Sequence, residues 1–121
     1  MGEALDELLA GVPYPAQLVP TIGRIVHYRL REHDAARVNA RRRAAGEIYR
    51  SRADSGTELQ CHDGNEAQAG DACPMLIVAV WGDTPDALVN GQVFLDGNDV
   101  HWATSVGCGE GPGTWSWPPR G

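Results

Sequence analysis

The chain has 121 residues, of which 42% are hydrophobic and 21% are charged, and its formal net charge is −6. These values exclude a disordered or fibrous protein and fit one globular domain with a single core. The longest apolar run, Met75 to Trp81, is far shorter than the roughly 20 residues of a membrane span. It therefore predicts a strand of the core and no membrane partner.

The first residues and the cysteines indicate the compartment. Glu3, Asp6 and Glu7 stand where a secretory signal carries positive charge, so we expect the chain to stay in the cytoplasm. The three cysteines are too few and too scattered for the disulfide framework of a small secreted protein, and we expect them to be reduced.

The front of the chain differs in character from the rest. Leucines recur at helical spacing over residues 2–11, and three prolines then favour an extended connector. We interpret residues 1–20 as an N-terminal helical appendage with a proline-rich connector. Residues 21–121 are interpreted as one β-rich domain.

The domain is predicted to begin with a strand and a helix. Residues 24–30 contain the β-branched Ile25 and Val26 and the aromatic Tyr28, which favour a strand. Residues from about 32 to 49 are predicted to be helical, because one stripe holds Ala35, Val38, Ala45 and Tyr49. Arg42 falls inside this stripe, and an inward guanidinium must find a carboxylate, carbonyl groups or a ligand.

The second half of the chain predicts further strands. Residues 51–72 are interpreted as a loop or weak hairpin with a short strand at 58–62. Strands follow at 75–81 and 89–95, and the tetrad Leu95-Asp96-Gly97-Asn98 predicts a type I′ hairpin turn.

The strand returning from this turn, residues 99–106, has two predicted faces. One face is predicted to carry Val100, Trp102, Thr104 and Val106, and the other His101, Ala103 and Ser105. The glycine-rich tail behind it is expected to cross a barrel and insert Trp115 or Trp117 as a plug. Five or six strands with one inserted helix predict a mainly β (α+β) fold: a small Src-homology-type barrel or a strongly bent antiparallel sheet.

Several stretches together resemble a family of small tailed-phage and prophage proteins of uncharacterised activity. They are Thr21-Ile-Gly-Arg-Ile-Val-His-Tyr28, Pro74-Met-Leu-Ile-Val-Ala-Val-Trp-Gly82, Val93-Phe-Leu-Asp-Gly-Asn98, Trp102-Ala-Thr-Ser105 and Gly111-Pro-Gly-Thr-Trp-Ser-Trp-Pro118. The resemblance covers roughly residues 21–119 and implies a viral protein acting in the host cytoplasm. The extension before Thr21 and the cysteines Cys61 and Cys73 depart from the pattern.

Metal and catalytic chemistry find little support in the sequence. The candidate zinc ligands Cys61, His62, Asp63, Cys73 and Cys108 do not have the paired spacing of a structural zinc site. Ser105 with His101 or His27 and an aspartate makes a triple that any chain of this size offers. We therefore expect no catalytic residue, no metal and no cofactor, and predict that the protein is not an enzyme.

Binding is better supported, by arginines and tryptophans. Residues 37–52 hold six arginines and one acid, a charge of +5, so the other residues carry −11. The candidate ligand-binding residues are Arg41, Arg42, Trp81, Asn90, Gln92, Asp96, Asn98, Trp102, Thr104, Trp115 and Trp117. The indoles would stack on a base, the arginines would meet a phosphate and the polar side chains would supply hydrogen bonds. In the simpler alternative, the arginines are a solvated helix face and at least two tryptophans belong to the core.

The leading functional hypothesis is a phage accessory protein that sequesters a small nucleotide-type ligand, a host-defence signal, or that binds a host protein. The alternative is a virion or assembly component docked through the N-terminal helix and the tryptophan-rich tail. Duplex nucleic acid is disfavoured by the −11 outside the arginine segment. Homo-oligomerisation stays open, since a sheet edge and an amphipathic helix both favour it.

Overall fold

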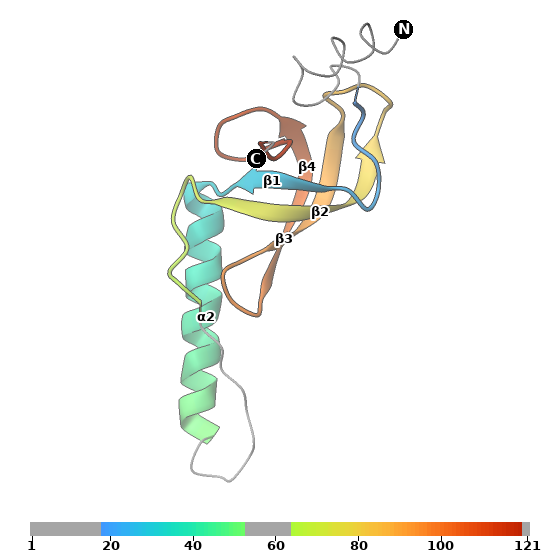
Figure 1. The fold of residues 1–121 in the computed structure, drawn as a ribbon. Coiled ribbons are helices and arrows are strands. Elements are labelled where there is room, and N and C mark those ends of the chain that lie inside the picture. The colour runs from blue at the N-terminus through green and yellow to red at the C-terminus, as the bar shows by residue number, and fades with distance from the viewer. Residues whose placement is uncertain (1–17, 53–63, 120–121) are drawn as a thin grey trace, which may run out of the picture.

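The computed structural model describes residues 18–52 and 64–119 of the chain (Figure 1). Its elements are β1 (Ile25–Arg29), α2 (Glu32–Arg52), β2 (Ala72–Trp81), β3 (Leu88–Phe94), β4 (Val100–Cys108) and β5 (Thr114–Ser116). The strand and helix predictions for the domain are confirmed, with shifts of a few residues at their ends. The predicted appendage helix and the predicted strand at 58–62 lie outside the described residues.

The five strands close into a barrel in the order β1-β2-β3-β4-β5. All neighbouring pairs are antiparallel except β4 and β5, which run parallel. This confirms the barrel form of the fold prediction, with one helix inserted between the first two strands. Figure 1 shows α2 projecting from one end of the barrel, with its C-terminal half well away from the strands.

The barrel interior is filled by alternate residues of the strands and by one indole. Val26, Met75 and Val93 are fully buried, and their side chains belong to a single apolar cluster. Trp115 is fully buried as well, and its Nε1–H donates to the carbonyl of Ala87 at 3.1 Å. The predicted plug is therefore Trp115, which satisfies its polar atom inside the core.

Helix α2 packs the apolar side chains of its first half into the barrel core. Its residues Ala35 and Val38 pack into the core as predicted, whereas Ala45 is exposed and Tyr49 is 40% exposed. The predicted stripe is wrong beyond Arg42, because there the helix has left the strands of the barrel. No helix among the described residues has the length and apolar character that crossing a membrane requires.

The apolar run of β2 is a strand, but it is not buried throughout. Met75 and Ile77 face the core, whereas Val78 and Trp81 are exposed. The prediction of a core strand is therefore correct for one face only. The sequence could not indicate which face is buried, because the residues of both faces are apolar and no apolar–polar alternation remains.

The β3–β4 hairpin forms as predicted, but its turn is not type I′. A type I′ turn needs a positive φ at both central residues. The φ of Asp96 is not positive, and Gly97 has an extended φ of 159°. Contacts from α2 hold the loop instead, since Arg42 donates to the Asp96 carbonyl and to the Asp99 carboxylate.

The predicted faces of β4 hold as far as Thr104 and are then reversed. Thr104 and Ser105 together oppose Asn90 of β3, which makes a β-bulge, and Ser105 has a φ of 51°. The extra residue turns Ser105 outward and Val106 into the core, where it is buried. Strict alternation could not predict this exchange.

Candidate functional site

The barrel closes through β5, but in the part of the chain that the structure describes β5 leaves part of the β4 edge without a neighbouring strand. The short β5 pairs with β4 only at Gly107 and Cys108, so among the described residues no strand lies beside β4 at 103–106 on that side. The chain entering α2 borders this part of the β4 edge. The result is a pocket of about 220 Å³, here called the wall pocket, lined chiefly by Tyr28, Arg31, Asp34, Arg37, His101 and residues 102–106.

A buried carboxylate organises the floor of the wall pocket. Asp34 is fully buried and lies in the first turn of α2, where its Oδ2 accepts the backbone N–H of Arg31 at 2.9 Å. This contact caps the helix start. The Arg31 guanidinium donates to both carboxylate oxygens, at 2.8 and 3.1 Å. Tyr28 donates its hydroxyl to Oδ2, and His101 Nε2 lies 3.1 Å from Oδ1.

These contacts fix the charge states of the floor. Burial of Asp34 opposes ionisation, but hydrogen bonds from Arg31 and Tyr28 outweigh it and hold the pKa of the carboxyl well below its usual range. Burial lowers the pKa of His101, and this exceeds the opposing effect of Asp34. Burial and the neighbouring Asp34 raise the pKa of Tyr28. Near neutral pH the floor therefore holds one carboxylate, a neutral imidazole and a neutral phenol.

The mouth of the wall pocket carries excess positive charge. Arg31 is neutralised by Asp34, with which it forms a two-point ion pair. Arg37 also lines the pocket, and its exposed side chain has no ion-pair partner among the described residues. With His101 neutral, the pocket has one positive charge in excess, so it suits an anionic group.

The β-bulge shapes the opposite wall. Asn90 Oδ1 accepts the backbone N–H of Ser105 at 2.7 Å, which supports the positive φ of Ser105. Residues other than glycine, asparagine or aspartate are uncommon in this conformation, and such strain concentrates at binding sites. The bulge places Thr104 and Ser105 side by side on the pocket wall, where both are exposed.

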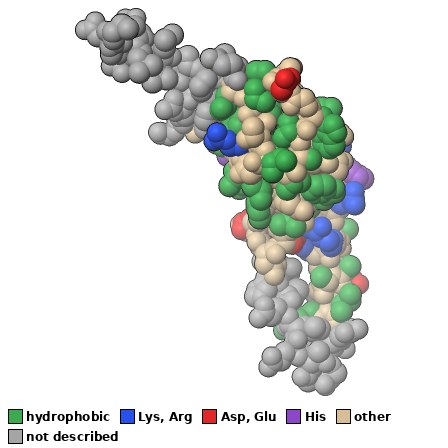
Figure 2. Space-filling model, turned by 90° about the vertical axis from the view of Figure 1, so that its right-hand side faces the viewer, with side chains coloured by type: hydrophobic (Ala, Val, Ile, Leu, Met, Phe, Trp, Pro, Cys, Tyr) green, Lys and Arg blue, Asp and Glu red, His purple; other side chains and the backbone are tan. Residues whose placement is uncertain are grey.

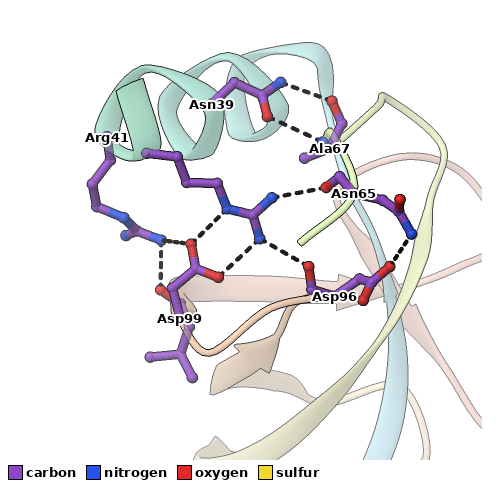
Figure 3. Close-up of polar contacts among 8 residues, drawn as sticks. Asn39, Arg41, Asn65, Ala67, Asp96 and Asp99 are labelled. Atoms are coloured by element: carbon purple, nitrogen blue, oxygen red, sulfur yellow. Dashed lines mark hydrogen bonds and ion pairs between the residues drawn. The ribbon is translucent and has the colours of Figure 1, made fainter. Parts of the chain in front are cut away.

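Arg41 and Arg42, predicted to bind a phosphate, contact Asp99 instead (Figure 3). Arg42 makes two 2.8 Å hydrogen bonds to that carboxylate and donates to the carbonyls of Asn65 and Asp96. The hydrogen bond from Arg42 holds the pKa of Asp99 below its usual value. Arg42 thus finds the carboxylate and carbonyl groups that its place in the helix demanded, and it ties α2 to the β3–β4 hairpin.

The four tryptophans lie in different surroundings. Trp115 fills the core, and Trp117 packs edge-on against it with ring centroids 5.7 Å apart. Trp81 is exposed on β2, opposite Leu88. Trp102 is 48% exposed and lines the wall pocket. Trp102 is therefore the indole placed to contact a ligand there.

The predicted polar residues are also dispersed. Thr104 lines the wall pocket, whereas Asn90 supports the bulge behind it. Gln92 lies on the outer barrel face between Leu76 and Trp102, Asp96 accepts a hydrogen bond from Asn65, and Asn98 is exposed in the hairpin loop. Of the predicted ligand-binding residues, the structure brings together Trp102 and Thr104 at this pocket.

Most residues of the wall pocket could not be recognised from the sequence. Tyr28, Arg31, Asp34 and Arg37 were not singled out as site residues, and His101 was considered only as a member of a catalytic triple. One usable signal was the acidic residue in the first turn of the helix, which can accept a backbone N–H or a side chain.

A larger hollow of about 620 Å³ is lined in part by Arg42. Its lining includes the acids Glu66, Asp71 and Asp96, while its arginine, Arg42, is already paired with Asp99. This charge balance does not suit an anion. Among the described residues no cluster of histidine, cysteine or acidic side chains could hold a metal ion, and Cys73 faces the core as a free thiol.

The pKa shifts predict two steps of acid destabilisation. Below the ordinary histidine value of 6.5, the unfolded chain takes up a proton that folded His101 resists, so the free energy of unfolding should fall. Below the ordinary aspartate value of 3.8 it should fall again, because Asp34 and Asp99 stay ionised only in the fold.

Urea unfolding across this pH range measures both steps. His101→Gln should remove the upper step and His27→Gln should keep it. An upper step that persists in His101→Gln would assign it to another group.

Comparisons of the chain with protein-family models, with curated proteins and with solved structures find no match.

Proposed function

We propose that the protein binds a small nucleotide-type ligand in the wall pocket, with the phosphate at Arg37 and the base on Trp102. The observation that carries this proposal is the charge of the pocket: Arg31 is cancelled by Asp34, whereas Arg37 has no ion-pair partner among the described residues. A guanidinium at the mouth of a polar pocket is suited to phosphate.

The remaining wall supports the same ligand class. Trp102 borders the pocket with a half-exposed indole, and stacking of a base on an aromatic ring contributes roughly 1–3 kcal/mol. Thr104 and Ser105 add hydroxyl groups that can donate to a phosphate or accept from a sugar. Binding is favoured over catalysis, since no hydrogen bond joins Ser105 to His101 in the described part of the chain.

The resemblance to phage proteins extends this proposal to a biological role. A viral protein that holds a nucleotide without converting it would act by sequestration. Capture of a nucleotide-type host-defence signal in the host cytoplasm is the role we propose. The arginine pair first expected to meet the phosphate serves the fold instead, and Arg37 takes its place in the proposal.

The alternative, a virion or assembly component, also has a specific observation in its favour. The strands β2, β3 and β4 contain no aspartate, glutamate, lysine or arginine. On their outer side Phe94 pairs with Val100, and all of Val78, Phe94, Val100 and Trp102 are exposed. Figure 2 shows a face of the barrel on which hydrophobic side chains gather with few charged ones. Such a patch is typical of a contact with another protein.

Native mass spectrometry of the freshly purified protein separates these functions, because it reports retained ligand and subunit number together. We expect an added mass of nucleotide size that is lost on denaturation. The occupied fraction should fall in Trp102→Ala and stay unchanged in Trp81→Ala, which removes an equally exposed indole from another strand. A protein without added mass that forms an oligomer through its barrel would support the alternative.

A further inference from the structure

The wall pocket contains a ring nitrogen with unused hydrogen-bonding capacity. His101 is only 6% exposed, and its Nε2 is engaged with Asp34. Its Nδ1 makes no hydrogen bond among the described residues, in which no fully buried side-chain nitrogen or oxygen lacks a partner. Nδ1 is therefore not sealed in the core, and His101 lines the pocket.

The surroundings decide what Nδ1 can do. The Asp34 carboxylate is ionised and can only accept, so the hydrogen between it and His101 must be carried by Nε2. Asp34 contacts the ring at Nε2, the Tyr28 ring lies with its centroid 6.4 Å from the imidazole, and Arg37 and Arg41 of α2 are the further charged groups that act on it. Burial and the two arginines favour the neutral ring over its protonated form. Nδ1 thus presents a lone pair, an acceptor, to the pocket.

The nearby donors do not satisfy this acceptor. The Tyr28 hydroxyl donates its hydrogen bond to Asp34, and the Nε and Nη2 groups of Arg31 donate to the same carboxylate. A ligand that fits the pocket must therefore combine an anionic group for Arg37 with a hydrogen-bond donor for His101. A buried acceptor left without a donor costs about 1–3 kcal/mol, so the site discriminates against ligands that lack one.

The size of the pocket indicates which part of a nucleotide carries the donor. Its volume of about 220 Å³ is below the roughly 300–1,000 Å³ of sites that enclose a drug-sized molecule. The sugar can enter, while the phosphate at Arg37 and the base beside Trp102 stay at the mouth. The donor within reach of the floor is then a hydroxyl of the sugar.

We propose that His101 makes the wall pocket specific for ribonucleotides, by accepting a hydrogen bond from a ribose hydroxyl at Nδ1. The inference rests on the proposed function and adds the ligand class that the pocket selects. His101 acts as a specificity-determining residue, and Asp34 is the positioning residue that fixes its tautomer.

The test compares adenosine 5′-monophosphate with its 2′,3′-dideoxy analogue by calorimetric titration of the full chain. We expect the ribonucleotide to bind roughly five- to tenfold more tightly, the effect of one hydrogen bond. His101→Gln keeps a donor for Asp34 and removes the acceptor at the Nδ1 position. It should lower the affinity for the ribonucleotide to that of the analogue. His27→Gln, the same change on β1 away from the pocket, should keep the preference.

A ligand-free measurement tests the premise in the unmodified protein. The ¹⁵N spectrum of labelled histidine should show His101 neutral near pH 7, with its proton on Nε2. A proton on Nδ1, or equal binding of the two nucleotides, would overturn the inference and leave the proposed function standing. Failure of both nucleotides to bind at millimolar concentration would overturn the proposed function, and the inference with it.

Discussion

Replacing Asp34 by alanine is expected to lower the free energy of unfolding by about 3–5 kcal/mol, the usual effect of removing one partner of a buried ion pair. The carboxylate is fully buried and accepts from Tyr28, Arg31 and His101. Without it, a phenol, an imidazole N–H and a guanidinium lose their acceptor at once, and α2 loses the cap at its first turn. Urea denaturation near neutral pH measures the change.

The matched control for this variant is Asp83→Ala. Asp83 is exposed in the turn after β2 and has no hydrogen bond or ion pair among the described residues, so its loss should change stability by less than about 0.5 kcal/mol. A loss below about 1 kcal/mol in Asp34→Ala would contradict the central place of this carboxylate in the fold.

Replacing Arg42 by alanine should cost about 2–3 kcal/mol, because the side chain is only 11% exposed and is bound by Asp99 and two carbonyl groups. Its loss removes the tie between α2 and the β3–β4 hairpin. Thermal or urea unfolding measures the difference, and the slope of the urea transition should stay the same if only stability changes.

The neighbouring arginine provides the control. Arg41 reaches the same carboxylate at 3.3 Å but is 50% exposed, so Arg41→Ala should cost no more than about 1 kcal/mol. Equal losses for the two variants would show that their different burial has no energetic consequence.

Much of the fold could be predicted from local pattern. The strands β1 and β3 follow from their β-branched and alternating residues, and α2 follows from its helical stripe. Two predictions were wrong for different reasons. Tyr49 was predicted on the buried stripe of α2 but is exposed, and Val106 was predicted on the face of Trp102 but points into the core. Helical periodicity does not reveal where a helix leaves the core, and strand alternation does not reveal a bulge.

The site was harder to predict because its residues come from separate segments. Asp34 and His101 are 67 positions apart, and the barrel brings them together by closing through β5, which pairs with both β1 and β4. The sequence placed an arginine cluster on the correct helix but could not tell Arg37, at the pocket, from Arg42, paired with Asp99. Which arginine is neutralised depends on tertiary contacts, and helical spacing alone does not contain them.

The central claim, that the wall pocket binds a nucleotide through Arg37, is tested most directly by titrating adenosine 5′-monophosphate into three proteins. They are the unmodified chain, Arg37→Gln and Arg43→Gln, which change two exposed arginines of the same helix, one at the pocket and one away from it. The account predicts that Arg37→Gln weakens binding by roughly ten- to a hundredfold and that Arg43→Gln binds as the unmodified chain does. Equal affinities in all three proteins, or no binding to the unmodified chain, would contradict it.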